Sequence, residues 1–319
     1  MNNYIEDLTT IISDCSMENT YKMSWSRALV EHAYNYPHKK EIHFDRISEL
    51  MFKYYWDQTI FFNLEQGPNH NKRPVIYQII LNEIELFRKQ NGQIPKKFIG
   101  LKYKFKKEII DKISKKLTDD VSYRFQYINK KRYNIYQYKK RQSKKSLILN
   151  NPKLIKENHK ILFQLINYRW TQHLENLNPG IPKIAQKVRG VDRDEVPKRK
   201  SLNKFKVFLD KENPDHKCFL TGEPIKDGEL SIDHIIPWSY MYSDDLWNLV
   251  YVKKSENSGW SNKIKNQEII NKLIKRNSRL LEIFETQNIS NKEVDLLRLA
   301  TERGGDQVKQ FWIGSKAQS

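Results

Sequence analysis

Two adjacent residues, Asp233 and His234, are of types that can do chemistry together, and two amides, Asn248 and Asn257, follow them at short distance. A carboxylate and an amide offer oxygen ligands that suit Mg²⁺, which also keeps waters and phosphate oxygens around it. A neutral imidazole accepts a proton from water near neutral pH. Hydrolysis of a phosphodiester bond requires both parts: a base for the nucleophile and a cation for the charge on the leaving oxygen.

The residues around this pair predict the elements that would position it. Apolar residues predict a β-strand over residues 230–236, a second short strand over residues 248–252, and a helix after Ser255. Adjacent residues on a strand point to opposite faces. In a hairpin that is capped by a helix, the carboxylate of Asp233 can therefore meet an amide near the helix start, here that of Asn257.

The motif formed by these residues is similar to that of a known family. The run Asp-His-Ile-Ile-Pro-Trp-Ser, followed by Asn-Leu-Val and then Glu-Asn-Ser-Gly, closely resembles HNH nucleases with the ββα-metal fold. The likeness is to the DHxxP…N…N form found in bacterial restriction and defence nucleases and in the HNH domain of RNA-guided CRISPR nucleases. It spans residues 218–263, a small part of the chain.

The resemblance implies a role for each motif residue. His234 would be the general base, and Asp233 and Asn257 would bind the metal. Asn248, the middle letter of the motif, is counted with the catalytic residues and would support the loop by hydrogen bonds. One divalent ion is implied, normally Mg²⁺ with Mn²⁺ as a substitute, and so are products with a 5′-phosphate and a 3′-hydroxyl.

The sequence departs from the family in two ways. Many HNH proteins hold their fold with two Cys-x-x-Cys pairs and a structural zinc, but here Cys218 is followed by Thr221 at the second position. We therefore expect no structural zinc. Apolar packing should replace it, from Phe219, Leu220, Ile225, Trp238 and Trp247. Relatives often carry cations just after the last motif residue, whereas the nearest one here is Lys263, a candidate phosphate contact.

A second feature is the concentration of positive charge. The chain has a net charge of +19, and residues 96–145 contain 18 Lys or Arg but four acidic residues. Such a stretch attracts polyanions, and aromatic residues beside cations suit stacking on bases. The alternative is an amphipathic segment whose aromatic side chains are buried. The candidate nucleic-acid contacts are Lys130, Lys131, Arg132, Lys139, Lys140 and Arg141.

These patterns predict an α+β protein with several parts. We expect a mostly helical region that contains the basic stretch, a basic linker, a small ββα-metal nuclease domain and a helical C-terminal tail. Their predicted bounds are residues 1–186, 187–203, 204–277 and 278–319. The two cysteines are far apart and suggest no disulfide framework. No apolar run is long enough for a membrane span and no signal pattern is evident, so a cytoplasmic protein is expected.

Three functions are compatible with the sequence. The leading one is a DNA endonuclease of the restriction or anti-phage defence type. The second is a regulated effector subunit that is inactive without a partner, and the third is a catalytically silent protein that binds nucleic acid. Nothing in the sequence distinguishes DNA from RNA as the substrate. A homodimer and a defence-system partner protein are both compatible with it.

Overall fold

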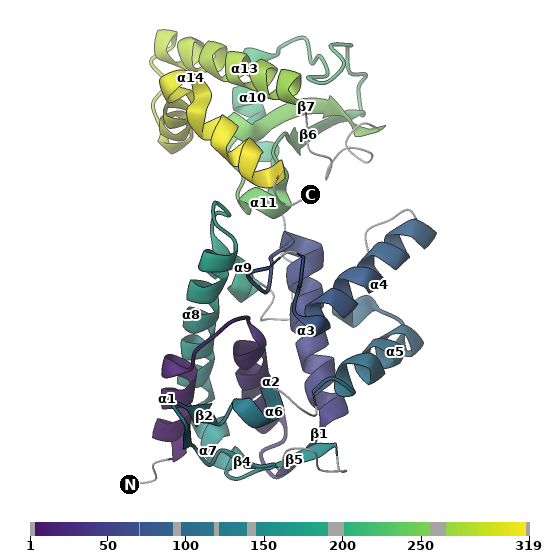
Figure 1. Cartoon of the computed structure of the whole chain (residues 1–319). Helices are drawn as coiled ribbons and strands as arrows, with labels where there is room; N and C mark the ends of the chain where they lie inside the picture. The colour runs from purple at the N-terminus through teal and green to yellow at the C-terminus, as the bar shows by residue number, and fades with distance from the viewer. Residues whose placement is uncertain are drawn as a thin grey trace. The chain divides into compact units, whose positions relative to one another are not determined.

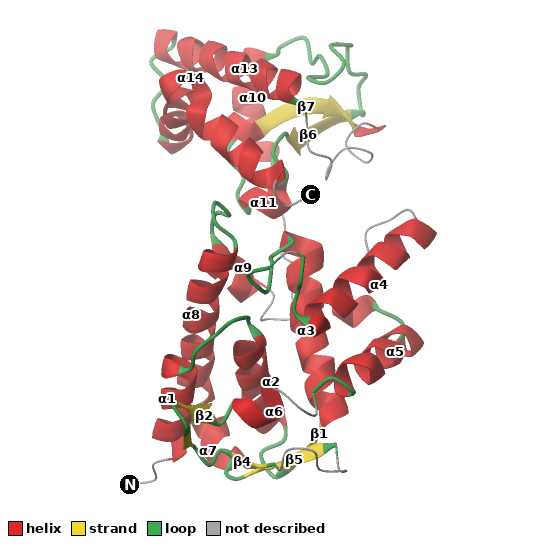
Figure 2. Cartoon of the chain, in the orientation of Figure 1, coloured by secondary structure: helices red, strands yellow, loops and turns green. Residues whose placement is uncertain are grey.

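The computed structural model describes residues 4–69, 71–91, 97–117, 121–138, 145–190, 201–255 and 266–316. The chain divides into two compact units, here called unit 1 (Met1–Pro179 and Ile184–Pro197) and unit 2 (Gly180–Lys183 and Lys198–Ser319). Helices make up most of both units and the strands are short, which confirms the predicted α+β class (Figure 2). Among the described helices, none is both long enough and apolar enough to cross a lipid bilayer.

Unit 1 is built mainly of helices (Figure 1). They pack around buried aromatic rings. Trp25 of α2, Tyr55 of α3 and Trp170 of α8 are fully buried, and the rings of Tyr55 and Trp170 meet edge to face at 6.2 Å. The helices are α1 (Tyr4–Asp14), α2 (Tyr21–Asn35), α3 (Phe44–Phe62), α4 (Val75–Asn91), α5 (Tyr103–Ser114), α6 (Val121–Arg124), α7 (Pro152–Glu157), α8 (His159–Leu177) and α9 (Ile184–Gly190), with a 3₁₀ turn η1 (Phe98–Gly100).

Short strands join distant parts of unit 1. They form an antiparallel sheet in the order β1-β5-β4 and a separate hairpin of β2 and β3. The sheet ties the segment before α3 to the segment before α7, so it closes the helical body at one end (Figure 1). The strands are β1 (Glu41–His43), β2 (Tyr127–Ile128), β3 (Lys131–Arg132), β4 (Tyr136–Gln137) and β5 (Ser146–Leu149).

The start of the predicted basic linker belongs to the body of unit 1. Helix α9 covers residues 187–190, the first four of the linker predicted over 187–203. Lys187 is fully buried there, and its ammonium lies 5.8 Å from the centre of the Phe62 ring. Burial of the lysine stem against α3 therefore replaces the solvent exposure that a linker would give it. Residues 191–200 lie outside the described residues.

Unit 2 contains an antiparallel hairpin of two five-residue strands, β6 and β7. In its register Asp233 is opposite Val250, and His234 is opposite Leu249. The elements of this unit are the 3₁₀ turn η2 (Asn203–Phe205), α10 (Lys206–Glu212), β6 (Leu230–His234), α11 (Trp238–Met241), the 3₁₀ turn η3 (Leu246–Asn248), β7 (Leu249–Lys253), α13 (Gln267–Thr286) and α14 (Lys292–Lys316).

Helix α13 joins the hairpin and the C-terminal residues into one core. Its buried side chains recur on one face, from Ile270 and Leu273 to Leu280 and Phe284. The same core takes in residues of β7 and of α14. The boundary predicted between residues 277 and 278 therefore falls inside α13, and the C-terminal tail packs as part of unit 2.

A break inside α14 lets its second half fold back onto the hairpin side of unit 2. The backbone leaves the helical conformation at Glu302–Gly305. At Gly305, φ is 78° and an added Cβ would lie 2.8 Å from the Ile274 side chain, so only glycine fits without a shift. Beyond the break, the Phe311 ring stacks on Trp247 of η3 at 5.9 Å.

Candidate active site

The last two residues of β6 are Asp233 and His234, and each is only 4% exposed. Their strand pairs with the fully apolar start of β7, so the polar pair lies against a covered sheet. Pro237 begins the next segment and cannot continue the strand ladder because it lacks an N–H. Two polar side chains at a buried strand end need partners, because an unpaired buried polar group destabilises the fold.

The partner of His234 is Asp244, which lies in the loop between α11 and η3. The imidazole Nε2 is 3.1 Å from the Asp244 Oδ1, with 3% of the histidine side chain and 16% of the aspartate side chain exposed. Sequence reasoning assigned no such role to Asp244. The only signal was the pair of acids at 244 and 245, and the sequence does not show which of them faces the histidine.

This contact determines which ring nitrogen of His234 can act as a base. An ionised carboxylate accepts hydrogen bonds and donates none, so the bond to Asp244 requires the proton on Nε2. In a neutral imidazole the other nitrogen, Nδ1, then carries the lone pair. Asp244 therefore holds His234 in the tautomer that accepts a proton at Nδ1.

Asn248 of η3 holds the chain that follows His234. Its Oδ1 accepts a hydrogen bond from the Ile236 N–H at 2.7 Å, and its Nδ2 donates to the Ile236 carbonyl at 2.9 Å. Its own carbonyl accepts from the Ile235 N–H at 3.0 Å. The side chain is 1% exposed. These contacts are those of a support for the loop, and none of them reaches the Asp233 or His234 side chain.

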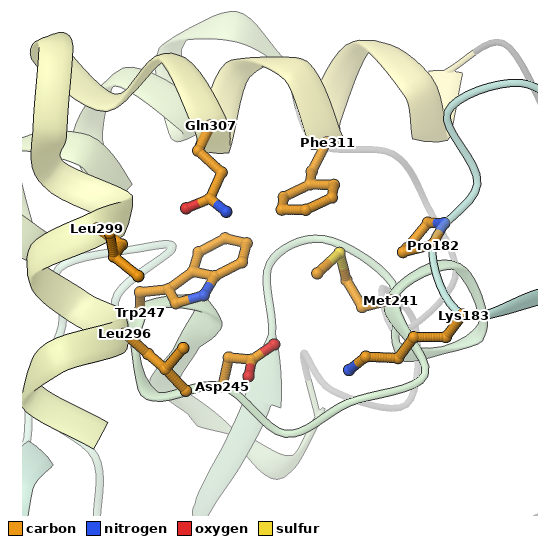
Figure 3. Close-up of a pocket in the computed structure, with 9 residues that line it drawn as sticks. All are labelled: Pro182, Lys183, Met241, Asp245, Trp247, Leu296, Leu299, Gln307 and Phe311. Atoms are coloured by element: carbon orange, nitrogen blue, oxygen red, sulfur yellow. The ribbon is translucent and has the colours of Figure 1, made fainter. Parts of the chain in front are cut away.

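The neighbouring acid, Asp245, has different surroundings. Its carboxylate accepts a hydrogen bond from the Ser243 hydroxyl at 2.6 Å and lines a cavity of about 190 Å³. Asp245 and Lys183 lie at one side of this cavity, opposite Gln307 and Phe311 of α14 (Figure 3). The rest of the lining is mostly apolar. The two adjacent acids thus differ in what they can do: Asp244 holds His234, and Asp245 does not.

Backbone hydrogen bonds close a turn at Cys218, the first position of the cysteine pattern. The Cys218 N–H donates to the Glu223 carbonyl and the Gly222 N–H donates to the Cys218 carbonyl, both at 2.7 Å. Burial favours the neutral thiol, but hydrogen bonds from the Thr221 hydroxyl and from backbone groups outweigh it and lower the pKa of Cys218. Thr221, at the second cysteine position, therefore bonds the sulfur directly.

Apolar packing around this turn follows the expectation in part. Phe219, Leu220 and Ile225 pack against the core of unit 2, and Trp247 belongs to that core. Trp238 does not: its ring lies at the start of α11 and meets Tyr242 at 4.9 Å. Trp238 is half-buried and lies outside this core, so the expectation was wrong for this residue.

The predicted metal ligands are only partly within the described residues. Asp233 is described, whereas Asn257 and the phosphate candidate Lys263 fall within residues 256–265, outside the described residues. Within the described part of the chain, no group of three or more His, Cys, Asp or Glu residues is placed to hold a metal ion. Asp233 thus stands as the described member of the predicted pair of ligands.

The candidate nucleic-acid contacts lie in unit 1. Lys130, Lys131 and Arg132 are exposed in the β2–β3 hairpin, whose two-residue turn has Asn129 and Lys130 at φ of 47° and 67°. Both positive values fit the turn that matches the twist of paired strands. The other candidates, Lys139, Lys140 and Arg141, lie outside the described residues.

Three of the six aromatic residues in 121–138 are buried and not available for stacking on bases, whereas Tyr123, Tyr127 and Tyr133 are half-buried. Phe125 and Tyr136 are fully buried with nearly parallel rings 6.2 Å apart, and Tyr138 is 4% exposed. The exposed aromatic residue of the basic stretch is Tyr103, 77% exposed at the start of α5 beside exposed Lys102 and Lys104. The amphipathic alternative therefore holds for Phe125, Tyr136 and Tyr138, whose rings form part of the unit 1 core.

The fold and these contacts define a class: an antiparallel hairpin with an Asp-His pair at one strand end, an asparagine support and a helix packed on it. Residues 218–266 match the model of the HNH endonuclease family. The chain therefore carries an HNH endonuclease domain, as its resemblance implied. No curated protein and no solved structure matches the chain.

Proposed function

We propose that the chain is a metal-dependent endonuclease that hydrolyses DNA phosphodiester bonds with His234 as its general base. The observation that carries the proposal is the contact of His234 with Asp244 inside the segment that matches the HNH family. A buried imidazole whose Nε2 is held by a carboxylate is oriented and has a defined basic nitrogen.

Asp233 fits the divalent ion that HNH nucleases use. Its carboxylate is a hard oxygen donor and stands next to the base at the end of β6. With Asn257 as the second ligand, it would hold one Mg²⁺, or Mn²⁺ in its place. Two protein ligands leave positions for water and phosphate oxygens. The bound ion supplies stabilisation of negative charge on the phosphate and on the leaving oxygen.

The residues of the chain carry out the proton transfer. His234 accepts at Nδ1 a proton from the water whose oxygen bonds to phosphorus. The bond between phosphorus and the 3′-oxygen breaks, and the 3′-oxygen takes a proton from solvent. One product ends in a 5′-phosphate and the other in a 3′-hydroxyl. Asp244 keeps the proton on Nε2 and stabilises the imidazolium that forms.

Phosphate contacts outside the hairpin would hold the substrate. We assign them to Lys263 and to the cations at 130–132 and 139–141, whose attraction to a phosphate backbone does not depend on base sequence. The likeness to the family favours DNA as the substrate. With the same phosphates, RNA would make the same contacts, and direct comparison of the two substrates decides between them.

The biological role that we propose is restriction or anti-phage defence in the cytoplasm. A nuclease that can cut the DNA of its own cell must be restrained. Unit 1 is a separate compact body that gives room for control by a partner protein or a second copy of the chain. DNA cleavage by the purified chain alone distinguishes an active nuclease from the two alternatives. A subunit that needs a partner and a protein that only binds nucleic acid would both fail to cleave.

The test is cleavage of supercoiled plasmid with Mg²⁺ or with EDTA. His234→Asn should lower the cleavage rate by about 10²- to 10⁴-fold, the usual contribution of a general base. His216→Asn is a matched control, because His216 also contacts a carboxylate, Asp210, at 3.0 Å in the same unit. The control should cleave at the wild-type rate, and EDTA should stop all cleavage.

Other outcomes decide between the alternatives. If wild type and His234→Asn bind DNA equally and neither cleaves it, a required partner or a silent binding protein replaces the proposal. Cleavage by His234→Asn at the wild-type rate would show that the assigned base is wrong. Cleavage that persists in EDTA would rule out the divalent ion.

A further inference from the structure

A fully charged side chain lies in the core of unit 2 behind the candidate active site. Arg276 of α13 is 3% exposed, and its Nη2 donates to the Leu249 carbonyl at 2.8 Å and to the Trp247 carbonyl at 3.2 Å. These two carbonyls belong to the residues directly before and after Asn248. A single guanidinium nitrogen therefore holds both sides of the asparagine that supports the loop after His234.

Burial of the Arg276 guanidinium charge at this position is energetically unfavourable. Within the described part of the chain Arg276 makes no ion pair, and its Nε and Nη1 have no hydrogen-bond partner. Burial lowers the pKa of Arg276 to about 10, partly opposed by Glu212, so the group is still charged at neutral pH. Burying a charge without a carboxylate partner destabilises a fold, and an apolar side chain of similar volume is often neutral or better.

The net gain in fold stability from Arg276 is therefore small, because the cost of burying its charge offsets its two hydrogen bonds. The two carbonyls that it binds are at the start of β7, and Leu249 is the residue opposite His234 in the strand register. The Asn248 side chain, held between them, binds both backbone groups of Ile236. Hydrogen bonds from Arg276 to the carbonyls on either side of Asn248, and from Asn248 to Ile236, thus connect α13 to the backbone that follows His234.

We infer that Arg276 is a positioning residue, which fixes α13 against the hairpin and so sets the place of Asn248 and His234. The inference rests on the proposed nuclease function for its effect on cleavage. Its structural content, that Arg276 orients the backbone at 235–236 and 248, can be measured without any cleavage.

The variant Arg276→Met in the full chain separates positioning from stability. Methionine fills much of the same volume and removes the buried charge, which offsets the loss of the two hydrogen bonds to the Trp247 and Leu249 carbonyls. The unfolding temperature should therefore stay within a few degrees of wild type. The kcat for plasmid cleavage at saturating Mg²⁺ should fall at least tenfold with KM unchanged, because the backbone behind the base loses its fixed place. Arg276→Lys, which keeps a cation but has less reach, should recover part of kcat.

The matched control is Arg279→Met, three residues further along the same helix. Arg279 is 63% exposed and pairs with Glu212, whose side chain is 11% exposed. Its loss should lower the unfolding temperature somewhat but leave kcat unchanged. The proposal is overturned if Arg276→Met stays folded with kcat unchanged. It is equally overturned if the loss of cleavage matches a loss of folded protein.

A second readout keeps this test independent of the nuclease function. Backbone amide signals of Ile235, Ile236 and Asn248, followed by NMR, should shift in Arg276→Met and stay in place in Arg279→Met. If the wild type does not cleave DNA but these shifts occur, the nuclease proposal fails and the positioning role stands. If the signals are the same in all three proteins, Arg276 does not position this backbone.

Discussion

The two units each contain a buried side-chain amide that holds a neighbouring backbone segment. In unit 2, Asn248 bonds both backbone groups of Ile236 at 2.7 and 2.9 Å. In unit 1, Gln126 Oε1 accepts from the N–H groups of Ile135 and Tyr136 at 2.9 and 2.8 Å. Both amides are 1% exposed. As pieces of structure, the two supports are nearly the same.

Their surroundings differ, and the difference separates a candidate active site from a core. The segment that Asn248 supports follows His234, which is paired with Asp244. The segment that Gln126 supports contains Tyr136, whose hydroxyl donates to the Ser122 carbonyl at 2.7 Å in an aromatic core. A buried polar support is therefore evidence of a site only when the chain that it holds bears groups able to react.

The largest effect in this comparison is expected from removal of either amide. Asn248→Ala and Gln126→Ala each remove two hydrogen bonds and leave buried backbone groups unpaired, which costs about 2–5 kcal/mol of stability. Urea unfolding of the full chain should show both losses. DNA cleavage, measured where each variant is folded, should fall for Asn248→Ala alone. Equal loss of cleavage in both variants would mean that stability, and not the support of His234, controls the rate.

The next effect concerns the orientation of the base. Asp244→Asn keeps the size of the side chain but removes the charge that holds the proton on His234 Nε2. We expect kcat to fall about 10- to 100-fold with KM unchanged, a usual cost of removing a group that orients a catalytic one. Plasmid cleavage under single-turnover conditions measures it.

The control for this prediction is the adjacent acid. Asp245→Asn can still accept the hydrogen bond from Ser243, and Asp245 lines the cavity beside α14 without touching His234. Its kcat should equal that of wild type. A rate as low as that of Asp244→Asn would mean that the whole acidic loop, and not one carboxylate, acts on the base.

The sequence predicted those parts of the site that depend on neighbours along the chain. The Asp-His pair, the two strands and the asparagine at their junction all lie within a short motif with fixed spacing, so local pattern was enough. Asp244 was missed because it lies ten residues after His234, beyond the turn of helix α11, and no spacing rule links the two. Arg276 was missed because a cation on an amphipathic helix ordinarily faces water.

The same limit explains the basic stretch. Alternating aromatic and cationic residues fit both a base-stacking surface and the covered face of a core, and periodicity does not distinguish them. Burial of Phe125, Tyr136 and Tyr138 depends on α2 and α3, which are distant in sequence: the Tyr136 ring meets Trp25 at 6.1 Å. Packing partners that lie so far away along the chain leave no local signal.

The smallest effect tests whether the cations beside that core bind DNA. Their exposed members form the β2–β3 turn, Lys130, Lys131 and Arg132. Replacing all three with Gln removes three charges without disturbing the buried rings. Affinity of the cleavage-deficient His234→Asn chain for duplex DNA should fall roughly three- to tenfold at moderate salt. The slope of log affinity against log salt should become shallower by up to about 0.9 for each phosphate that the turn had neutralised.

A matched triple change shows whether the effect belongs to the turn or to net charge. Lys153, Lys156 and Lys160 are exposed cations of the same unit, outside the basic stretch, on α7 and α8. Their replacement with Gln lowers the net charge by the same amount. If only the turn variant loses salt dependence, these cations touch phosphate, and unit 1 combines a covered aromatic core with a DNA-binding edge. If both triples weaken binding equally, the turn has no special role, and long-range attraction by the whole basic surface accounts for the affinity.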